Sequence, residues 1–196
     1  MNNNTENKIE QDVSYSKNIS VYYDVEKTNT LNFDVDSFAP KVLWKEEVPF
    51  TPNLKVSVFD VAALIIKMKG AMTTMKLHKL LYYCQAWSLV WDERPLFTEK
   101  IEAWANGPVV KDLFSYHRGL YTISNISIGN PDLLDENQKE TINSVLNYYG
   151  DKPSQWLIEL THLETPWRNA RNGLSLTERG SNAISHESMA EYYSSL

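Results

Sequence analysis

Hydrophobic residues between positions 75 and 91 recur at the spacing of one helix face. The positions i, i+3, i+4, i+7 and i+14 are occupied by Leu77, Leu80, Leu81, Cys84 and Trp91. Most of the remaining circumference is also apolar, since it carries Met75, Tyr82, Tyr83, Trp87, Leu89 and Val90. A helix that is apolar on so much of its surface needs neighbours on several sides. We therefore predict the buried central helix of a compact, mainly α-helical bundle.

Capping and stop signals predict further helices on both sides of this one. Ser57 with Asp60 resembles a capping box, and it opens a helix that ends at Gly70 and buries Val58, Val61, Leu64, Ile65 and Met68. Thr73 or Thr74 can cap the central helix. Pro108 suits the first residue of a helix that runs to about His117, because its missing amide costs nothing there. Later helices are predicted at 135–150, 154–164, 165–172 and 185–196, opened by Asp135 with Gln138, Ser154, Thr165–Pro166 and Ser185.

Alternating hydrophobic and polar residues predict a few strands. One short strand is expected at residues 100–104, where Ile101 and Ala103 share a face. Two alternating runs, from Ile19 to Val25 and from Leu31 to Val35, indicate an N-terminal β-hairpin extension. Residues 1–17 are polar and are expected to form a disordered arm, and residues 18–55 are expected to hold the hairpin and a proline-containing connector. Residues 56–196 would then form the helical domain.

Composition narrows the function classes. The net charge of −6 gives no overall field that would attract nucleic acid or an anionic membrane, so we expect neither as a partner. The stretch at 75–91 is too short and too polar to span a bilayer, and the N-terminus has no apolar signal-peptide region. The single cysteine, Cys84, is interpreted as a buried apolar residue in a protein of the reducing cytoplasm.

Few residues suggest chemistry. The sequence has no glycine-rich phosphate loop, no nucleophile-elbow motif and no zinc spacing, so we expect no catalytic residue, metal or cofactor. His162 and Glu164 are the closest His/carboxylate pair, but two residues apart on a helix they would point to different sides. We interpret His162 as a structural residue at a helix end, satisfied by a hydrogen bond. Lys76, His78 and Lys79 are interpreted as the solvated strip of the central helix, or else as a rim for an acidic partner.

Three segments together resemble a known family. They are KLHKLLYYCQAWSLVW with PLFTEKIEAWANGPVVKDLFSYH, then LTHLETPWRNAR, then AISHESMAEYY. In this order and spacing, from Val58 to Tyr193, they resemble the Panacea (SocA-like) domain of bacterial and phage antitoxins. The EAWANGP run and the H-x-E-x-P-W run are the specific parts of the likeness.

The resemblance implies a helical domain that is the antidote of a toxin–antitoxin pair and binds a cognate protein toxin directly. One alternative that it implies is an adaptor that delivers the toxin to an ATP-dependent protease. Another alternative is an enzyme or ligand-binding protein using Glu102, His162 and Glu164, which could form one polar network. The residues that match the family motif are Leu80, Gln85, Glu102, Trp104, Gly107, Pro108, His162, Glu164 and Trp167. We interpret Gly107–Pro108 as a turn, and Trp104 and Trp167 as packing residues.

Overall fold

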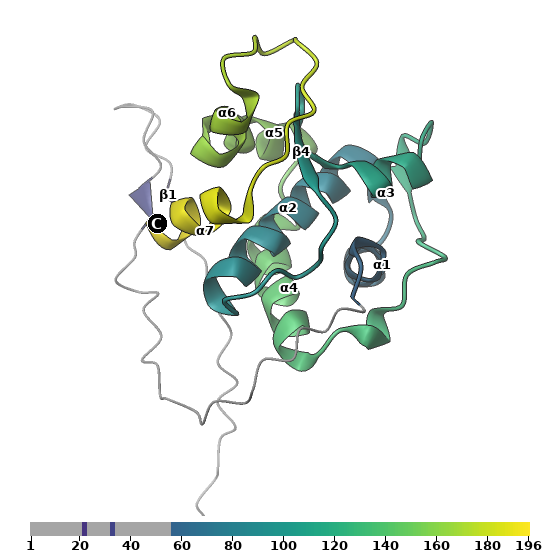
Figure 1. The fold of residues 1–196 in the computed structure, drawn as a ribbon. Coiled ribbons are helices and arrows are strands. Elements are labelled where there is room, and N and C mark those ends of the chain that lie inside the picture. The colour runs from purple at the N-terminus through teal and green to yellow at the C-terminus, as the bar shows by residue number, and fades with distance from the viewer. Residues whose placement is uncertain (1–20, 23–31, 34–55) are drawn as a thin grey trace, which may run out of the picture.

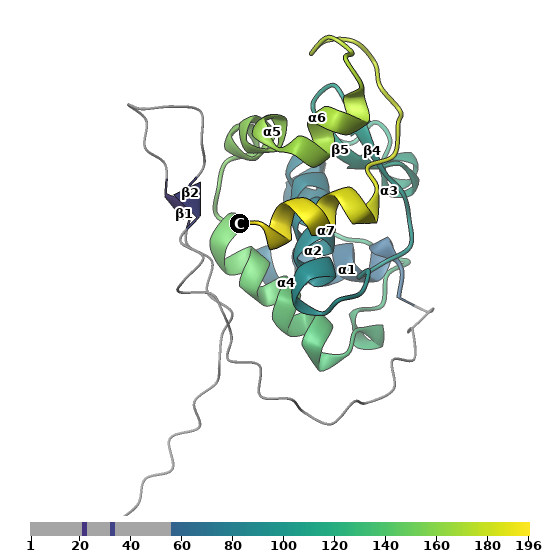
Figure 2. The ribbon, with the colours of Figure 1, turned by 60° about the vertical axis from the view of Figure 1, so that its left-hand side comes forward.

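Helix α2 (Thr74–Trp91) runs through the middle of the domain in a computed structural model that describes residues 21–22, 32–33 and 56–196. Every residue of α2 from 77 to 88 is buried. The helix is surrounded by α1 (Val58–Lys69), α4 (Glu136–Tyr149), α5 (Ser154–Leu163) and α7 (His186–Ser194), with α4 and α7 packed along much of its length (Figures 1 and 2). The prediction of a mainly α-helical bundle around a buried central helix is confirmed.

Most predicted helix starts are confirmed by their capping hydrogen bonds. Thr73, rather than Thr74, caps α2, because its hydroxyl accepts from the amide of Lys76 at 3.2 Å. Asp60 accepts from the Ser57 amide at 2.8 Å at the start of α1. The capping box of α4 and the Ser185 cap of α7 are also formed. Because these contacts span only three residues, the local sequence is enough to specify them.

Two details of the predicted helices are wrong. Met68 is exposed, because the buried face of α1 passes through Ile66 instead. Ser154 is the first residue of α5 and does not cap it, since the N-cap is Pro153 and the Ser154 hydroxyl lies 2.8 Å from the hydroxyl of Thr73. That contact ties the start of α5 to the start of α2.

The largest departure from the predicted elements is at Pro108. The predicted strand is confirmed as β4 (Ile101–Trp104), but Pro108 lies in a second strand, β5 (Gly107–Val110), that pairs with it antiparallel. The helix that was predicted to begin at Pro108 begins three residues later, as α3 (Lys111–Tyr116). Ala105–Asn106 forms the turn, and Gly107 opens β5 with a φ of 92°.

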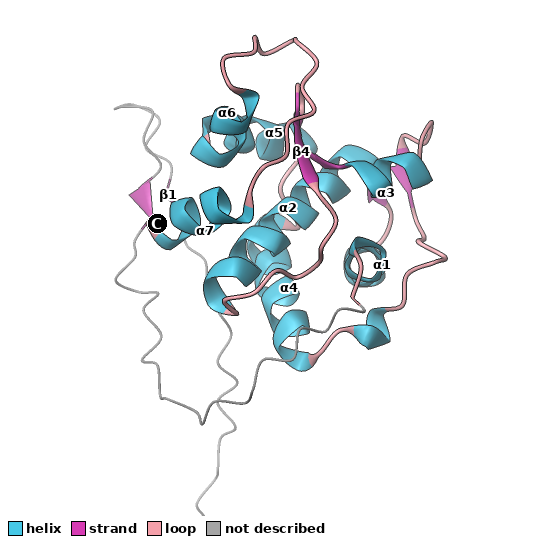
Figure 3. Ribbon diagram, in the orientation of Figure 1, coloured by secondary structure: helices cyan, strands magenta, loops and turns pink. Residues whose placement is uncertain are grey.

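The chain returns to this hairpin near its end. Ala103 donates its amide to the carbonyl of Asn182, and Ile184 donates to the carbonyl of Ile101, both at 2.8 Å. Strand β4 therefore has a neighbour on each side, as Figure 3 shows where the loop before α7 runs beside β4. The short helix α6 (Thr165–Arg171) packs against β4 and α7. Strands β3 (Met72–Thr73) and β6 (Thr122–Ile123) form a second antiparallel pair, followed by a 3-10 turn at Pro131–Leu133.

The N-terminal extension is described only in part. Val21–Tyr22 and Asn32–Phe33 pair antiparallel as β1 and β2, within the two runs that the sequence assigned to a hairpin. The predicted arm at 1–17, the rest of the hairpin and the connector up to residue 55 lie outside the described residues. The division of the chain into these three parts stays a prediction. Within the described residues, no helix is long and apolar enough to cross a membrane.

Candidate functional site

Glu164 lies at the junction of α5 and α6 and is enclosed by tyrosines. Its Oε1 accepts a hydrogen bond from the hydroxyl of Tyr83 on α2 at 3.2 Å, and its Oε2 accepts from Tyr193 on α7 at 2.8 Å. Tyr83 is stacked on Tyr149 of α4, with ring centroids 4.0 Å apart. This cluster therefore joins α2, α4, α7 and the α5–α6 junction at one buried carboxyl group.

Burial keeps the carboxyl group of Glu164 mostly protonated at neutral pH. Loss of solvation raises the pKa of Glu164 to about 8, although the hydrogen bonds from Tyr193 and Tyr83 act in the opposite direction. A protonated carboxyl can donate one hydrogen bond and accept others, which suits hydroxyl partners. Burial, and then the proximity of Glu164, also raises the pKa values of Tyr83 and Tyr193 well above normal. The cluster is thus a neutral polar core that holds helices together.

Gln85 connects α2 to two distant segments. Its Oε1 accepts from the amides of Leu96 and Phe97, both at 3.1 Å, and its Nε2 donates to the carbonyl of Phe97 at 3.2 Å. Nε2 also lies 2.9 Å from Nε2 of His186, in the first turn of α7. Gln85, Leu96 and Phe97 are buried and His186 is half-buried, so this motif residue fixes the path of the chain. Leu80, another motif residue, is fully buried beside it on α2.

The other acidic and aromatic motif residues form a separate chain of contacts. The indole of Trp104 donates to Glu102 at 2.7 Å, and the indole of Trp167 donates to the carbonyl of Trp104 at 3.0 Å. His162 is stacked on Trp167 with ring centroids 4.2 Å apart. Among the described residues Glu164 bonds to tyrosines instead, so Glu102, His162 and Glu164 do not form the single network that the sequence suggested.

His162 lies in the last turn of α5, at a helix end as predicted. Its ring is half-buried, and burial is the main cause that lowers its pKa. A backbone hydrogen bond with Ala105 acts in the opposite direction, which agrees with the predicted hydrogen-bonded histidine, while Nε2 has no partner among the described residues. This bond and the stacking on Trp167, which is almost fully buried, together orient the ring.

Lys79 is fully buried, which contradicts its assignment to a solvated strip. Its Nζ donates to the carbonyl of Pro108 at 2.9 Å, and burial lowers its pKa to about 7. His78 is buried as well, and only Lys76 of the three residues is partly exposed. Since neither Lys79 nor His78 reaches the surface, the alternative of a rim for an acidic partner is also wrong for these two residues.

Gly107 leaves the space through which the Lys79 side chain passes. A Cβ at Gly107 would lie 2.6 Å from Cε of Lys79 and 2.8 Å from Oγ1 of Thr161. The positive φ of Gly107 also strains any other residue. Gly107→Ala is therefore expected to lower the free energy of unfolding by roughly 2–4 kcal/mol, measured by chemical denaturation.

The matched control for this substitution is Gly119→Ala. Gly119 has a φ of 90°, but nothing lies within 4 Å of its would-be Cβ. It is expected to lose only the backbone contribution, on the order of 1–2 kcal/mol. If the two substitutions lower the free energy of unfolding equally, the close approach of Lys79 does not prevent a side chain at position 107.

His78 and His117 form a buried pair with their Nε2 atoms 2.8 Å apart. Nδ1 of His78 accepts from the amide of Val110 at 3.2 Å, so its ring proton is on Nε2 and is donated to His117. Burial lowers the pKa of both rings, and the charge of Lys79 adds to the effect on His78. Both rings are therefore neutral near pH 7. No cluster of three or more metal-binding side chains occurs in the described part of the chain.

This histidine pair forms part of the wall of a pocket of about 200 Å³. The pocket lies between the start of α2, the β4–β5 turn, α3 and the loop before α7, and its other lining residues include Thr74, Trp104, Asn106, Phe114, Thr177 and Arg179. Of the predicted motif residues, Trp104 is the one that contributes to this lining. His117, Phe114 and Arg179 were not singled out by the sequence, since the pocket is assembled from segments far apart in the chain.

Arg171 holds the loop that carries Thr177 and Arg179. Its buried guanidinium donates to the carbonyl of Ala103 at 3.2 Å, to that of Glu178 at 2.7 Å and to that of Ser175. It also lies over the ring of Trp167, 5.2 Å from the centroid. The side of the pocket formed by this loop is therefore fixed against β4 and α6.

The comparison with family models gives one match. Residues 77–168 match the family described as "Antitoxin SocA-like, Panacea domain". The match is shorter than the resemblance from Val58 to Tyr193, because α1 and α7 lie outside it. Searches among curated proteins and among solved structures gave no match. The match runs from α2 to α6 and includes every motif residue discussed above, so this part of the chain is similar to the SocA-like Panacea antitoxin family.

Proposed function

We propose that this protein is a cytoplasmic antitoxin that neutralises a co-encoded protein toxin by binding it directly. The family match supports a role in a toxin–antitoxin system. The main structural support is the place of the polar motif residues Gln85 and Glu164, which are buried and bonded to the protein itself. These residues stabilise the helical scaffold, and they leave the surface free to serve as a binding face.

An enzyme based on Glu102, His162 and Glu164 has less support. These three side chains do not converge, and none of them lines the pocket. The raised pKa of Glu164 results from its burial, and in this buried position no substrate can reach it. A carboxyl group with a shifted pKa that is enclosed in the core affects the stability of the fold, and it cannot react with a ligand.

Co-expression with the product of the neighbouring reading frame tests the proposal. The expected result is that this product stops growth alone, that the full chain restores growth, and that the two proteins co-purify at a fixed stoichiometry. Protection without a complex, accompanied by turnover of a toxic small molecule, would contradict direct binding. An immunoblot of the toxin separates masking from delivery to a protease, because masking leaves the toxin level unchanged and delivery lowers it.

A further inference from the structure

The pocket beside the histidine pair opens next to an exposed apolar segment. Leu120 and Tyr121 are 56% and 80% exposed. Their backbone carbonyls accept hydrogen bonds from Thr74, which lines the pocket. The Thr74 hydroxyl donates to the Leu120 carbonyl at 3.4 Å, and the Thr74 amide donates to the Tyr121 carbonyl at 3.0 Å. Leu120 also donates its amide to the carbonyl of His117, another lining residue, at 2.9 Å. The apolar segment is therefore bonded directly to two lining residues of the pocket and lies beside it.

The pocket itself combines an aromatic wall with a cation. Trp104 and Phe114 meet edge to face at 4.7 Å, and Phe114 meets His117 at 5.7 Å. Its volume of about 200 Å³ is large enough for a benzene-sized group. Arg179 is the one arginine among the lining residues, which include no lysine, aspartate or glutamate, whereas the chain as a whole has a net charge of −6. This surface is thus complementary to an apolar group that carries a carboxylate close by.

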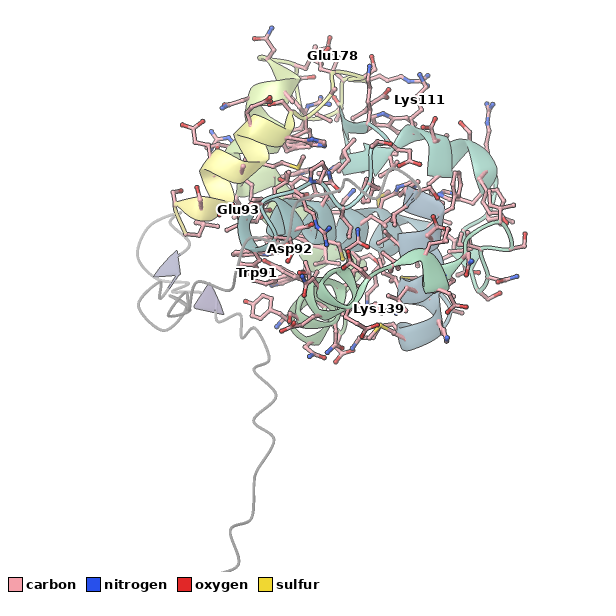
Figure 4. The ribbon with its side chains drawn as sticks, turned by 60° about the horizontal axis from the view of Figure 1, so that its bottom comes forward. Trp91, Asp92, Glu93, Lys111, Lys139 and Glu178 are labelled. Carbon is pink, nitrogen blue, oxygen red and sulfur yellow. The ribbon has the colours of Figure 1, made fainter. Side chains whose placement is uncertain are left out.

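The two segments that flank the pocket are held in place by hydrogen bonds within the protein. The loop with Arg179 is held by Arg171, and the segment with Leu120 and Tyr121 is held by Thr74 and by the β3–β6 pair. Figure 4 shows Lys111 and Glu178, from α3 and the loop before α7, in the upper part of the domain, apart from Trp91, Asp92 and Glu93 at the end of α2. A preformed, partly apolar surface binds a partner with little loss of conformational entropy.

We propose that this surface is where the toxin binds, with the pocket receiving an aromatic or aliphatic side chain of the toxin and Arg179 pairing with an adjacent carboxylate. Tyr121 and Leu120 then cover the rim of the contact. The exposed apolar residues favour a protein over a free small molecule, because a small ligand inside the pocket would leave them in water. This inference rests on the proposed function, and it specifies the contact face and the chemistry of the toxin segment.

Three substitutions test the three parts of the surface. Arg179→Glu reverses the charge, Tyr121→Ser removes the aromatic rim, and Thr177→Phe fills the pocket from its exposed loop. None of these side chains is in the buried core, so the variants are expected to keep the helical circular dichroism and the Tm of the wild type. Each is expected to weaken binding of the purified neighbouring-frame product to the full chain by roughly 10- to 100-fold, measured by isothermal titration calorimetry.

Matched variants at residues that do not line the pocket serve as controls. Arg168→Glu makes the same charge change on α6, and Leu163→Ser removes an exposed apolar residue of α5. Both are expected to bind within twofold of the wild type. If the wild type binds and all three test variants bind equally well, this surface is not the contact face, although the proposed function holds. If the wild type shows neither binding nor protection, the proposed function fails and this inference fails with it.

Discussion

Gln85→Leu is expected to lower the free energy of unfolding by about 3–6 kcal/mol, which is a large part of the stability of an ordinary domain. Leucine has a similar volume, but it leaves the buried amides of Leu96 and Phe97 without an acceptor. Each buried donor that is left unpaired costs about 1–3 kcal/mol. The contact with His186 is lost as well, so α7 is held less firmly against α2. If the protein is the antitoxin that we propose, the variant should protect cells poorly at 37 °C, even though Gln85 is buried.

Chemical denaturation measures this effect, and Gln155→Leu is its control. Gln155 is exposed on α5 and bonds only to the side chain of Glu159, at 2.9 Å. A surface change of that kind is expected to alter stability by about 0.5 kcal/mol or less. If the free energy of unfolding of Gln85→Leu is also within about 1 kcal/mol of the wild-type value, the position of residues 96–97 does not depend on the Gln85 side chain.

The sequence predicted best the features that neighbouring residues determine. The caps at Ser57, Thr73, Asp135 and Ser185 are contacts across three residues, and the apolar pattern of α2 follows from the helical repeat alone. The strand at Pro108 was missed for the opposite reason. A proline after a glycine suits the start of a helix, and the pairing of β5 with β4 depends on contacts that the local pattern does not contain.

The burial of Lys79 and His78 could have been predicted from the same pattern that predicted α2. A helix that is apolar around nearly all of its circumference has no face left for a solvated strip, so polar residues within it must find partners inside the protein. What the sequence could not supply is the identity of those partners. The carbonyl of Pro108 and the ring of His117 come from β5 and α3, and only the fold brings them to α2.

The candidate site shows the same limit. Glu102, His162 and Glu164 were predicted to form one network because all three belong to motifs of the same family, but each lies in a different environment. The pocket was not predicted, because its walls come from four segments and from residues such as Phe114 and Arg179 that carry no motif. A family motif in this protein marks mainly what holds the scaffold together, and the surface that we propose for the toxin uses other residues.

The stability of Glu164→Gln relative to the wild type is expected to rise with pH. The pKa of Glu164 is about 8 in the folded protein and 4.5 without the fold. Between these values the folded state binds more protons than the unfolded state, so the wild type loses stability as the pH rises from about 4.5 to about 8. The full difference corresponds to on the order of 5 kcal/mol. Glutamine cannot ionise and can still bond to Tyr83 and Tyr193, so the variant lacks this loss.

The measurement is the difference in the free energy of unfolding between variant and wild type, taken by urea denaturation at several pH values from 5 to 9. Lys79 and the buried histidines titrate in both proteins, so their contributions cancel in the difference. The variant is expected to be close to the wild type at pH 5 and several kcal/mol more stable at pH 9, whereas Glu159→Gln on the exposed face of α5 should show no such trend. A difference that stays constant across this range would mean that the carboxyl group of Glu164 ionises freely, and that the tyrosine cluster is open to water.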